Sequence, residues 1–411
     1  GGLVRASDGL LYGTTKFGQA GQVDGAGSIF KIAEAGTGFQ IIHRFAPVTA
    51  SNQDLNPINV NGAYPEAELV EGADGYLYGV ARAGGPNGTG TIFKISRDGT
   101  DFKLLHSFAA VTSSSTSGLT VTVDGAAPTG PLVASTDNFF YGTTSQGGAN
   151  GRGVVFRIAF DGTGFQVLHE FSATTADTTT GLLENADGAT PLAGLLDGGD
   201  GYFYGMASQG GTDGNGVIFA LPADGSTFTV LHSFTGADGA RPIAELMLAS
   251  SGKLYGVTSG GGVNTSGTAT TLGTIFSIDR AGTNFARLYS FDGQHGSLPS
   301  SRLLETTPGV FVGAAANAAL VMKAPEIAEN GAVVPVDVTS NIPNTSFIAI
   351  LVKKNPFPLS SSFEFANGAV GDVSVRLKVA ETSVIQAIAK ADGKVYSAQK
   401  EVKVTVGGCG G

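Results

Sequence analysis

The chain has 411 residues but only one cysteine, no tryptophan and three methionines. A lone cysteine excludes an intrachain disulfide, so the thiol is reactive, links two chains or has no role. Charged residues are scarce at 14%, and the formal net charge of −10 argues against nucleic acid as a partner. No stretch of 18 apolar residues is present, so we predict no membrane span. The sequence also lacks a nucleotide-binding loop, an HExxH motif and a serine elbow, and we expect no catalytic machinery and no cofactor.

The cysteine, Cys409, lies in a terminal arm otherwise made of Gly407, Gly408, Gly410 and Gly411. Glycines lack side chains that could bury the sulfur, and they let the backbone bend or enter a narrow cleft. The arm is therefore suited to deliver a thiol to a distant site. It contains no cation, and the nearest one in sequence is Lys403. We therefore expect a partner to supply the group that activates the thiol.

The segment before the arm predicts a small all-β domain. Its β-rich runs are AVVPVDVTS, SFIAILVKK, SFEF, VSVRLKVAE, SVIQAIAKA and KVYSAQKEVKVTV. Turn pairs such as Asn367-Gly368 and Asp392-Gly393 separate the runs. This pattern is typical of an immunoglobulin-like β-sandwich, which we place at residues 322–406 with the arm at 407–411.

Five phrases of this segment closely resemble SoxY, the carrier subunit of the periplasmic thiosulfate-oxidising (Sox) system. They are APEIAENGAVVPV, IAILVKKNPFPLSSSFEF, VRLKVAETS, GKVYSAQKEVKVTV and the terminal GGCGG. The resemblance implies that Cys409 binds a sulfur substrate covalently and carries it between enzymes. It also implies a SoxZ-like sandwich subunit as partner, together with haem, manganese-dependent and molybdenum-containing Sox enzymes.

The preceding 320 or so residues are an internal repeat, which the SoxY family does not have. Three marks recur in a fixed order five times: a Tyr-Gly pair, an Ile-Phe or Val-Phe pair, and a His two residues before a Phe. The tyrosines are Tyr12, Tyr78, Tyr141, Tyr204 and Tyr255, and the histidines are His43, His106, His169 and His232, with Tyr289 in the fifth place.

Each repeat offers four strand-sized pieces joined by glycine-rich turns, which is typical of a β-propeller blade. The pattern DGxLYGxTxxGG, GxIFKI, FxxLHxF resembles the GloVer tandem repeats of exported bacterial proteins. We predict a propeller over residues 1–321, with blades at about 3–45, 65–108, 128–171, 191–234 and 242–291 and a partial sixth blade at 300–321. The sixth blade either closes on the first through Leu3 to Ala6 or receives a missing strand from elsewhere.

The recurring polar residues favour structural roles. Equivalent positions in a propeller are far apart, so we expect each histidine to bond a neighbouring turn while its Phe packs in the core, and His295 to lie in a loop. Asp-Gly pairs such as Asp8-Gly9 and Asp74-Gly75 match hairpin turns, and no local cluster provides the oxygen ligands of calcium. We predict no metal site.

The composition indicates an exported protein, periplasmic or at the cell surface. The sequence begins Gly-Gly without Met, as a mature form would after its export signal is removed.

The negative charge is unevenly distributed along the chain. Residues 324–411 hold eight basic and eight acidic side chains, so the repeats carry the whole excess of negative charge. Candidate glycosylation sites are Asn87, Asn264 and Asn344.

Two functions of different class remain open. In the first, the chain is a sulfur carrier and the propeller is a docking or localisation platform. In the second, it is a subunit of an extracellular filament, in which the strand KEVKVTVGG is donated to the incomplete blade of the next copy. The carrier explains the thiol; the filament explains the large added repeat domain.

Overall fold

The computed structural model describes residues 2–17, 25–51, 56–114, 119–263, 267–293, 296–316, 320–324, 327–329, 333–340, 345–352, 359–364, 371–378, 383–391 and 394–405. These residues form strands, turns and loops and no helix, so none of them makes a membrane-spanning helix. The all-β class is confirmed. The chain divides into two compact units, one comprising residues 1–235, 241–248 and 278–285, and the other residues 236–240, 249–277 and 286–411.

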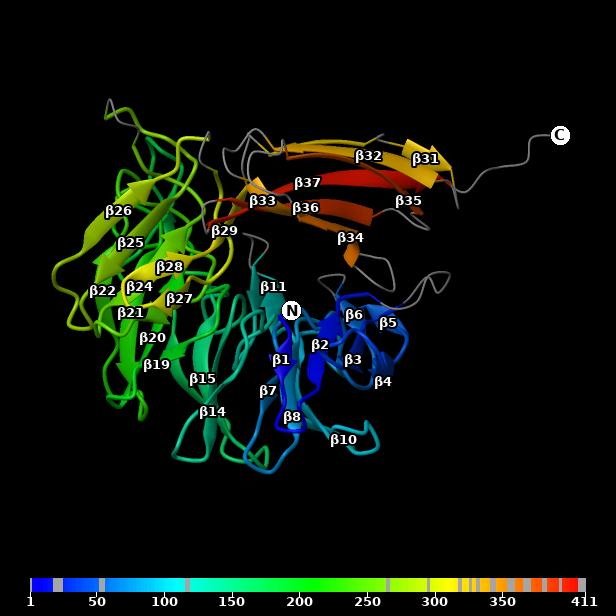
Figure 1. Cartoon of the computed structure of the whole chain (residues 1–411). Coiled ribbons are helices and arrows are strands. Elements are labelled where there is room, and N and C mark those ends of the chain that lie inside the picture. Colours follow the sequence, from blue (N-terminus) through cyan, green and yellow to red (C-terminus); the bar gives the residue numbers. More distant parts are fainter. Residues whose placement is uncertain are drawn as a thin grey trace. The chain divides into compact units, whose positions relative to one another are not determined.

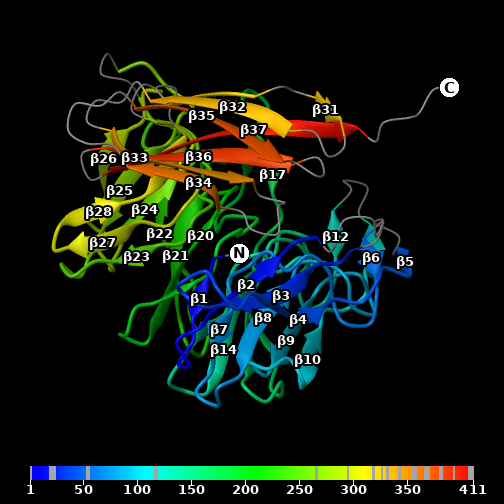
Figure 2. The ribbon, with the colours of Figure 1, turned by 45° about the vertical axis from the view of Figure 1, so that its right-hand side comes forward.

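Each of the five repeats forms one four-stranded sheet with its strands in chain order. The first two sheets consist of β1 (Val4–Arg5), β2 (Leu11–Thr15), β3 (Ser28–Ile32), β4 (Gln40–Arg44), then β7 (Val70–Glu71), β8 (Leu77–Ala81), β9 (Thr91–Ile95) and β10 (Phe102–Ser107). The third and fourth consist of β13 (Val133–Ala134), β14 (Phe139–Thr144), β15 (Val154–Ala159), β16 (Gln166–Glu170), then β19 (Leu196–Asp197), β20 (Tyr202–Ala207), β21 (Val217–Pro222) and β22 (Thr229–Ser233). The fifth consists of β23 (Met247–Leu248), β24 (Leu254–Thr258), β25 (Thr274–Ile278) and β26 (Ala286–Ser290). Neighbouring strands of the first four sheets pair antiparallel, and Figures 1 and 2 show these sheets side by side in chain order, from blue to green.

The Tyr-Gly and Ile-Phe marks are explained by the register of the two middle strands. Gly79 of β8 stands opposite Phe93 of β9. A Cβ atom at Gly79 would lie 2.7 Å from both the Phe93 ring and the Leu69 side chain. The glycine therefore makes room for the aromatic ring of the neighbouring strand, and the same pairing recurs at Gly13 and Phe30, Gly142 and Phe156, and Gly205 and Phe219.

The long connections after the first three sheets are not wholly irregular. Each contains a short antiparallel hairpin. The hairpins are β5 (Ala50–Ser51) with β6 (Pro57–Ile58), β11 (Ser113–Ser114) with β12 (Thr120–Val121), and β17 (Thr175–Ala176) with β18 (Leu183–Glu184). The described part of each of these connections thus contains a pair of hydrogen-bonded strands.

Successive repeats are locked together by a strained residue followed by proline. Thr190 has a φ of 56°, and its N–H donates to the carbonyl of Arg152 in the preceding repeat at 2.9 Å. The following Pro191 packs on Gly153, whose φ of 96° suits glycine and where a Cβ atom would lie 2.9 Å from the proline ring. The same lock is built at Tyr64, Ala127, Arg241 and Leu298, each with positive φ and each followed by proline. We call this contact the αL-Pro lock.

The first strand β1 pairs with β2 of its own sheet, through Val4 with Tyr12 and Arg5 with Leu11. Val4 and Arg5 thus complete the first sheet, and closure of a sixth blade through Leu3 to Ala6 stays a prediction.

The predicted sixth blade is shorter than expected. Only β27 (Leu304–Thr307) and β28 (Val310–Val312) form a sheet with each other. The next two strands, β29 (Ala314–Ala316) and β30 (Leu320–Lys323), pair with strands of the C-terminal domain instead. β29 and most of β30, which precede the expected boundary at residue 322, thus have their ladders in the later sheets.

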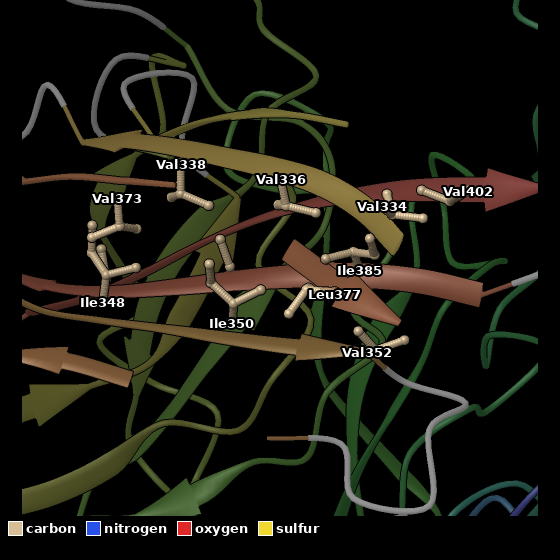
Figure 3. Close-up of a cluster of buried hydrophobic side chains, with 12 residues drawn as sticks. Val334, Val336, Val338, Ile348, Ile350, Val352, Val373, Leu377, Ile385 and Val402 are labelled. Atoms are coloured by element: carbon tan, nitrogen blue, oxygen red, sulfur yellow. The ribbon is translucent and has the colours of Figure 1, made fainter. Parts of the chain in front are cut away.

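The C-terminal domain has two sheets that share one apolar core. The larger has the order β29-β37-β36-β33-β34, with β31 also on β37, and the smaller has the order β30-β32-β35. The strands not yet named are β31 (Ile327–Glu329), β32 (Val333–Ser340), β33 (Thr345–Val352), β34 (Leu359–Glu364), β35 (Gly371–Lys378), β36 (Ser383–Ala391) and β37 (Lys394–Thr405). In Figure 3, Val336 and Val338 of the smaller sheet and Ile348 and Ile350 of the larger lie in one cluster, and all four are fully buried. Alternate residues of β32, β33 and β36 contribute to this core, so side chains from both sheets pack together.

Candidate functional site

The strand that leads to the cysteine arm, β37, is held on both of its edges. It pairs antiparallel with β36 from Lys394 to Val402, parallel with β29 on the other edge from Val395 to Ser397, and parallel with β31 from Lys403 to Thr405. Val402 points into the shared core with no exposed surface. The root of the arm is therefore fixed by two ladders and a buried side chain.

Cys409 and the arm glycines Gly407, Gly408, Gly410 and Gly411 lie outside the described residues. The strand ends at Thr405, so the sulfur-bearing residue follows the ordered sheet by four positions. Lys403, the cation nearest to the cysteine in sequence, is exposed on the strand next to buried Val402. The arrangement places a positive charge near the start of the arm.

The repeat histidines have the structural role expected of them. His169 Nε2 donates to Asp187 Oδ2 at 3.0 Å, and the His169 ring stands edge-on to Phe171, which is buried. His106 makes the same pair with Asp124 at 2.9 Å. His43 instead faces Asn61, whose Nδ2 lies 3.2 Å from His43 Nε2. Burial lowers the pKa of His43 to about 4. His295 lies outside the described residues.

The Asp-Gly pairs form turns, as predicted. Gly75 has a φ of 77°, and Asp74 accepts hydrogen bonds from Tyr76 N–H at 3.2 Å and from the Tyr78 hydroxyl at 2.7 Å. Burial and this carboxylate raise the pKa of the Tyr78 hydroxyl, which keeps it a hydrogen-bond donor. The Asp74 carboxylate is thus used within its own repeat. Within the described part of the chain, no group of three His, Cys, Asp or Glu residues is placed to hold a metal ion.

Of the three candidate glycosylation sites, the structure describes Asn87 and leaves Asn264 and Asn344 outside the described residues. The Asn87 amide nitrogen, to which a sugar would be attached, donates to the Phe108 carbonyl at 2.8 Å. Asn150 makes the equivalent bond to Phe171 at 3.0 Å in the next repeat, although no Ser or Thr follows it at the required position. Asn87 is therefore explained as a structural residue of the repeat, and this geometry does not favour modification there.

The filament hypothesis requires the strand of residues 400–408 to be free to pair with a neighbouring copy of the chain. Residues 400–402 pair with β36, and residues 403–405 pair with β31. Donation would have to break both ladders, so the structure does not favour this route to a filament.

Two contacts between repeats were missed in the sequence. The sequence does mark the position of the αL-Pro lock, because an Ala or Ser stands two residues before the proline at the start of each repeat. It does not reveal the positive φ of the residue between them, because the identity of that residue varies from repeat to repeat. The second contact is a carboxylate clamp: Glu71 accepts hydrogen bonds from Ser7 N–H at 2.7 Å and from the Ser7 hydroxyl at 2.8 Å. A glutamate on a short edge strand gave no sign of a partner 64 residues away.

Comparison with known proteins matches both parts of the chain. Residues 1–183 and 174–339 match the family described as the Gloeobacter/Verrucomicrobia repeat. Residues 310–409 match the family described as the sulfur oxidation protein SoxY. No curated protein matches the chain.

Solved structures with detectable similarity cover either the C-terminal domain or most of the chain. The sulfur carrier protein SoxY from Chlorobium limicola f thiosulfatophilum is 40% identical over 23% of this chain and 84% of its own, with a TM-score of 0.22. Superoxide reductase (neelaredoxin) from Ignicoccus hospitalis is 24% identical over 21% of this chain and 79% of its own, with a TM-score of 0.19. A polysaccharide lyase of the PL25 family, an ulvan lyase, is 10% identical over 97% of this chain and 91% of its own, with a TM-score of 0.44.

The family matches agree with the two patterns found in the sequence, the repeated Tyr-Gly, Ile-Phe and His-x-Phe marks and the terminal β-domain with its GGCGG arm. The chain belongs to the Gloeobacter/Verrucomicrobia repeat family and carries a SoxY domain at its C-terminal end.

Proposed function

We propose that the chain is a covalent carrier of oxidised sulfur, loaded on Cys409, with the repeats as its docking or localisation platform. The observation that carries the proposal is the extent of the SoxY match, which runs from residue 310 to Cys409 itself. A family match that ended before the terminal arm would support a shared fold alone. The SoxY match includes Cys409, the residue to which a carrier would attach its sulfur substrate.

The geometry before the arm supports this use. A carrier needs a mobile thiol on a fixed root, because partner enzymes must find the thiol without unfolding the domain that bears it. β37 provides the root through its ladders to β36 and β31 and through buried Val402. The glycine-rich sequence after Thr405 provides a segment without bulky side chains.

The chemistry requires a thiolate and a partner. When thiosulfate is attached, the Cys409 thiol loses its proton, and a bond forms between Sγ and the terminal sulfur of thiosulfate. Two electrons leave, and we assign their acceptor to a haem enzyme of the Sox system. A SoxZ-like sandwich is the proposed subunit partner, and the propeller arrangement of the repeats and a periplasmic or cell-surface location belong to the same proposal. The chain itself contributes the nucleophile, not catalysis.

The test is mass spectrometry of the C-terminal peptide from cells grown on thiosulfate. We expect sulfur and sulfonate adducts on Cys409 in the wild type and none in a Cys409→Ser variant with the same melting temperature. An unmodified Cys409 during active thiosulfate oxidation would refute the carrier function. Cells grown without thiosulfate provide the matched control.

A further inference from the structure

The last half-repeat, β27 with β28, docks on the fifth repeat in the way that complete repeats dock on each other. Glu305 accepts hydrogen bonds from Ser250 N–H at 2.7 Å and from the Ser250 hydroxyl at 3.0 Å. This reproduces the clamp between Glu71 and Ser7 in the first interface. The half-repeat therefore uses the same carboxylate contact as a full one.

Two further contacts repeat the pattern. Leu298, with a φ of 49°, donates its N–H to the Leu272 carbonyl at 2.7 Å. Pro299 packs on Gly273, where a Cβ atom would lie 2.6 Å from the proline ring, so the αL-Pro lock is complete. The rings of Phe311 and Tyr255 lie 4.3 Å apart, as those of Phe140 and Tyr78 do at 4.4 Å.

The strand that begins in this half-repeat continues into the SoxY domain. In the second repeat, β8 is one uninterrupted strand, Leu77–Ala81. At the equivalent place, residues 310–312 form β28 in the half-repeat, and residues 314–316 form β29, which pairs parallel with Val395 to Ser397 of β37. Only Gly313 separates them, and a Cβ atom there would lie 2.8 Å from the Leu303 side chain. One segment thus belongs to both sheets.

The family matches overlap at the same place. The repeat match extends to residue 339, and the SoxY match begins at residue 310. Residues 310–316 lie at the start of the range, residues 310–339, that both matches cover.

We infer that residues 310–316 are a strand shared by the repeat array and the SoxY domain, so that the last repeat and the arm-bearing strand β37 unfold as one unit. The platform then acts on the root of the cysteine arm directly through a hydrogen-bonded ladder. This inference holds whether or not Cys409 carries sulfur. It predicts that loosening the half-repeat loosens β37, whose paired residues lie about 80 positions later in the chain.

The test is hydrogen exchange on the full chain carrying Glu305→Ala. Loss of the carboxylate clamp should speed amide exchange about tenfold at β27 and β28 and also at residues 395–397. The matched control is Glu71→Ala, which removes the same clamp from the first interface. It should speed exchange at β1 and β7 and leave residues 395–397 unchanged.

Two outcomes would overturn the inference. One is wild-type exchange at residues 395–397 in Glu305→Ala, and the other is an equal increase there in Glu71→Ala. The reverse experiment is Ala315→Pro, which removes an N–H from the β29 ladder. It should speed exchange at β27 and β28, and wild-type protection of those strands would also contradict a shared strand.

Discussion

The imidazole of His169 lies parallel to the phenyl ring of Phe228 in the next repeat, with 3.6 Å between the ring centroids. The same relationship joins successive repeats at three other places. These are His43 with Phe102 at 4.0 Å, His106 with Phe165 at 3.9 Å, and His232 with Phe285 at 3.7 Å. The histidine of each repeat is thus covered by an aromatic ring from its successor, and the repeats stabilise one another in sequence order.

Removing one ring of this stack should weaken the repeat unit as a whole. For Phe228→Ala we expect a loss of about 2–4 kcal/mol in the free energy of unfolding, because the substitution removes contacts with His169, Phe171 and Phe219. Urea unfolding measures this change. Val123→Ala, at a residue that is 67% exposed, is the control and should change the stability by less than about 0.5 kcal/mol. Equal effects of the two variants would show that the stack contributes nothing.

The repeat histidines bond an aspartate in some repeats and an asparagine in the first, which suggests two substitutions of Asp187 to compare. Asp187 accepts hydrogen bonds from His169 and from Ser172 N–H at 3.1 Å. Burial opposes ionisation of Asp187, but these bonds outweigh it and lower the pKa of the carboxyl. Asp187→Ala should cost about 1–3 kcal/mol at neutral pH, because it removes the acceptor of three donors, the His169 ring, the Ser172 N–H and the Ser172 hydroxyl.

Asp187→Asn should be tolerated better, since Asn61 holds the same place beside His43 and accepts the Ala46 N–H at 2.7 Å. Chemical denaturation of both variants at pH 7 checks the order. A larger loss for the asparagine than for the alanine variant would be inconsistent with this role.

The first repeat should be sensitive to mild acid. The pKa of His43 is about 4 in the folded chain because burial disfavours its charged form, whereas an unfolded histidine titrates near its ordinary value of 6.5. The unfolded chain therefore binds the additional proton first. Stability is fully present above about pH 6.5 and is lost as the pH falls toward 4.

The measurement is the midpoint of urea unfolding at pH 7 and pH 5 for the wild type and for His43→Phe, which keeps an aromatic ring against Phe102. We expect the variant to lose less stability between the two pH values. An identical loss would mean that His43 does not cause the acid sensitivity.

The αL-Pro lock predicts different costs for two glycines with similar backbone angles. Gly216 has a φ of 98°, and a Cβ atom there would lie 2.5 Å from the Ala207 carbonyl and 2.7 Å from the Pro242 ring, whereas Gly201 has a φ of 87° and would meet nothing within 4 Å. Gly201→Ala should cost about 1–2 kcal/mol for the left-handed backbone. Gly216→Ala should cost about 1–3 kcal/mol more, because the added methyl group also overpacks the carbonyl of its own repeat and the proline of the next. Thermal unfolding of the two variants measures the difference in stability between them. Equal melting temperatures would show that the methyl group at position 216 causes no additional steric cost.

Local patterns in the sequence determined the elements of this protein. The Tyr-Gly and Ile-Phe pairs predict two adjacent strands because a ring such as Phe93 needs the space that Gly79 leaves. The Asp-Gly pairs predict turns because glycine adopts positive φ without strain, and alternation of apolar residues predicts the core of the sandwich. The position of the cysteine arm in the chain could be read from Cys409 and its glycines alone.

Only the tertiary structure decided which strands share a sheet. Residues 314–323 carry the apolar pattern of a blade, and that pattern is equally suited to the sandwich, because a strand buries its apolar face against whichever core its ladder reaches. β29 pairs with β37, far along the chain. This pairing depends on backbone hydrogen bonds, which the order of side chains in the sequence does not predict. For the same reason the strained residue before each proline could not be foreseen: its φ is set by the Gly and carbonyl of the preceding repeat, while its own side chain varies from Ala127 to Arg241.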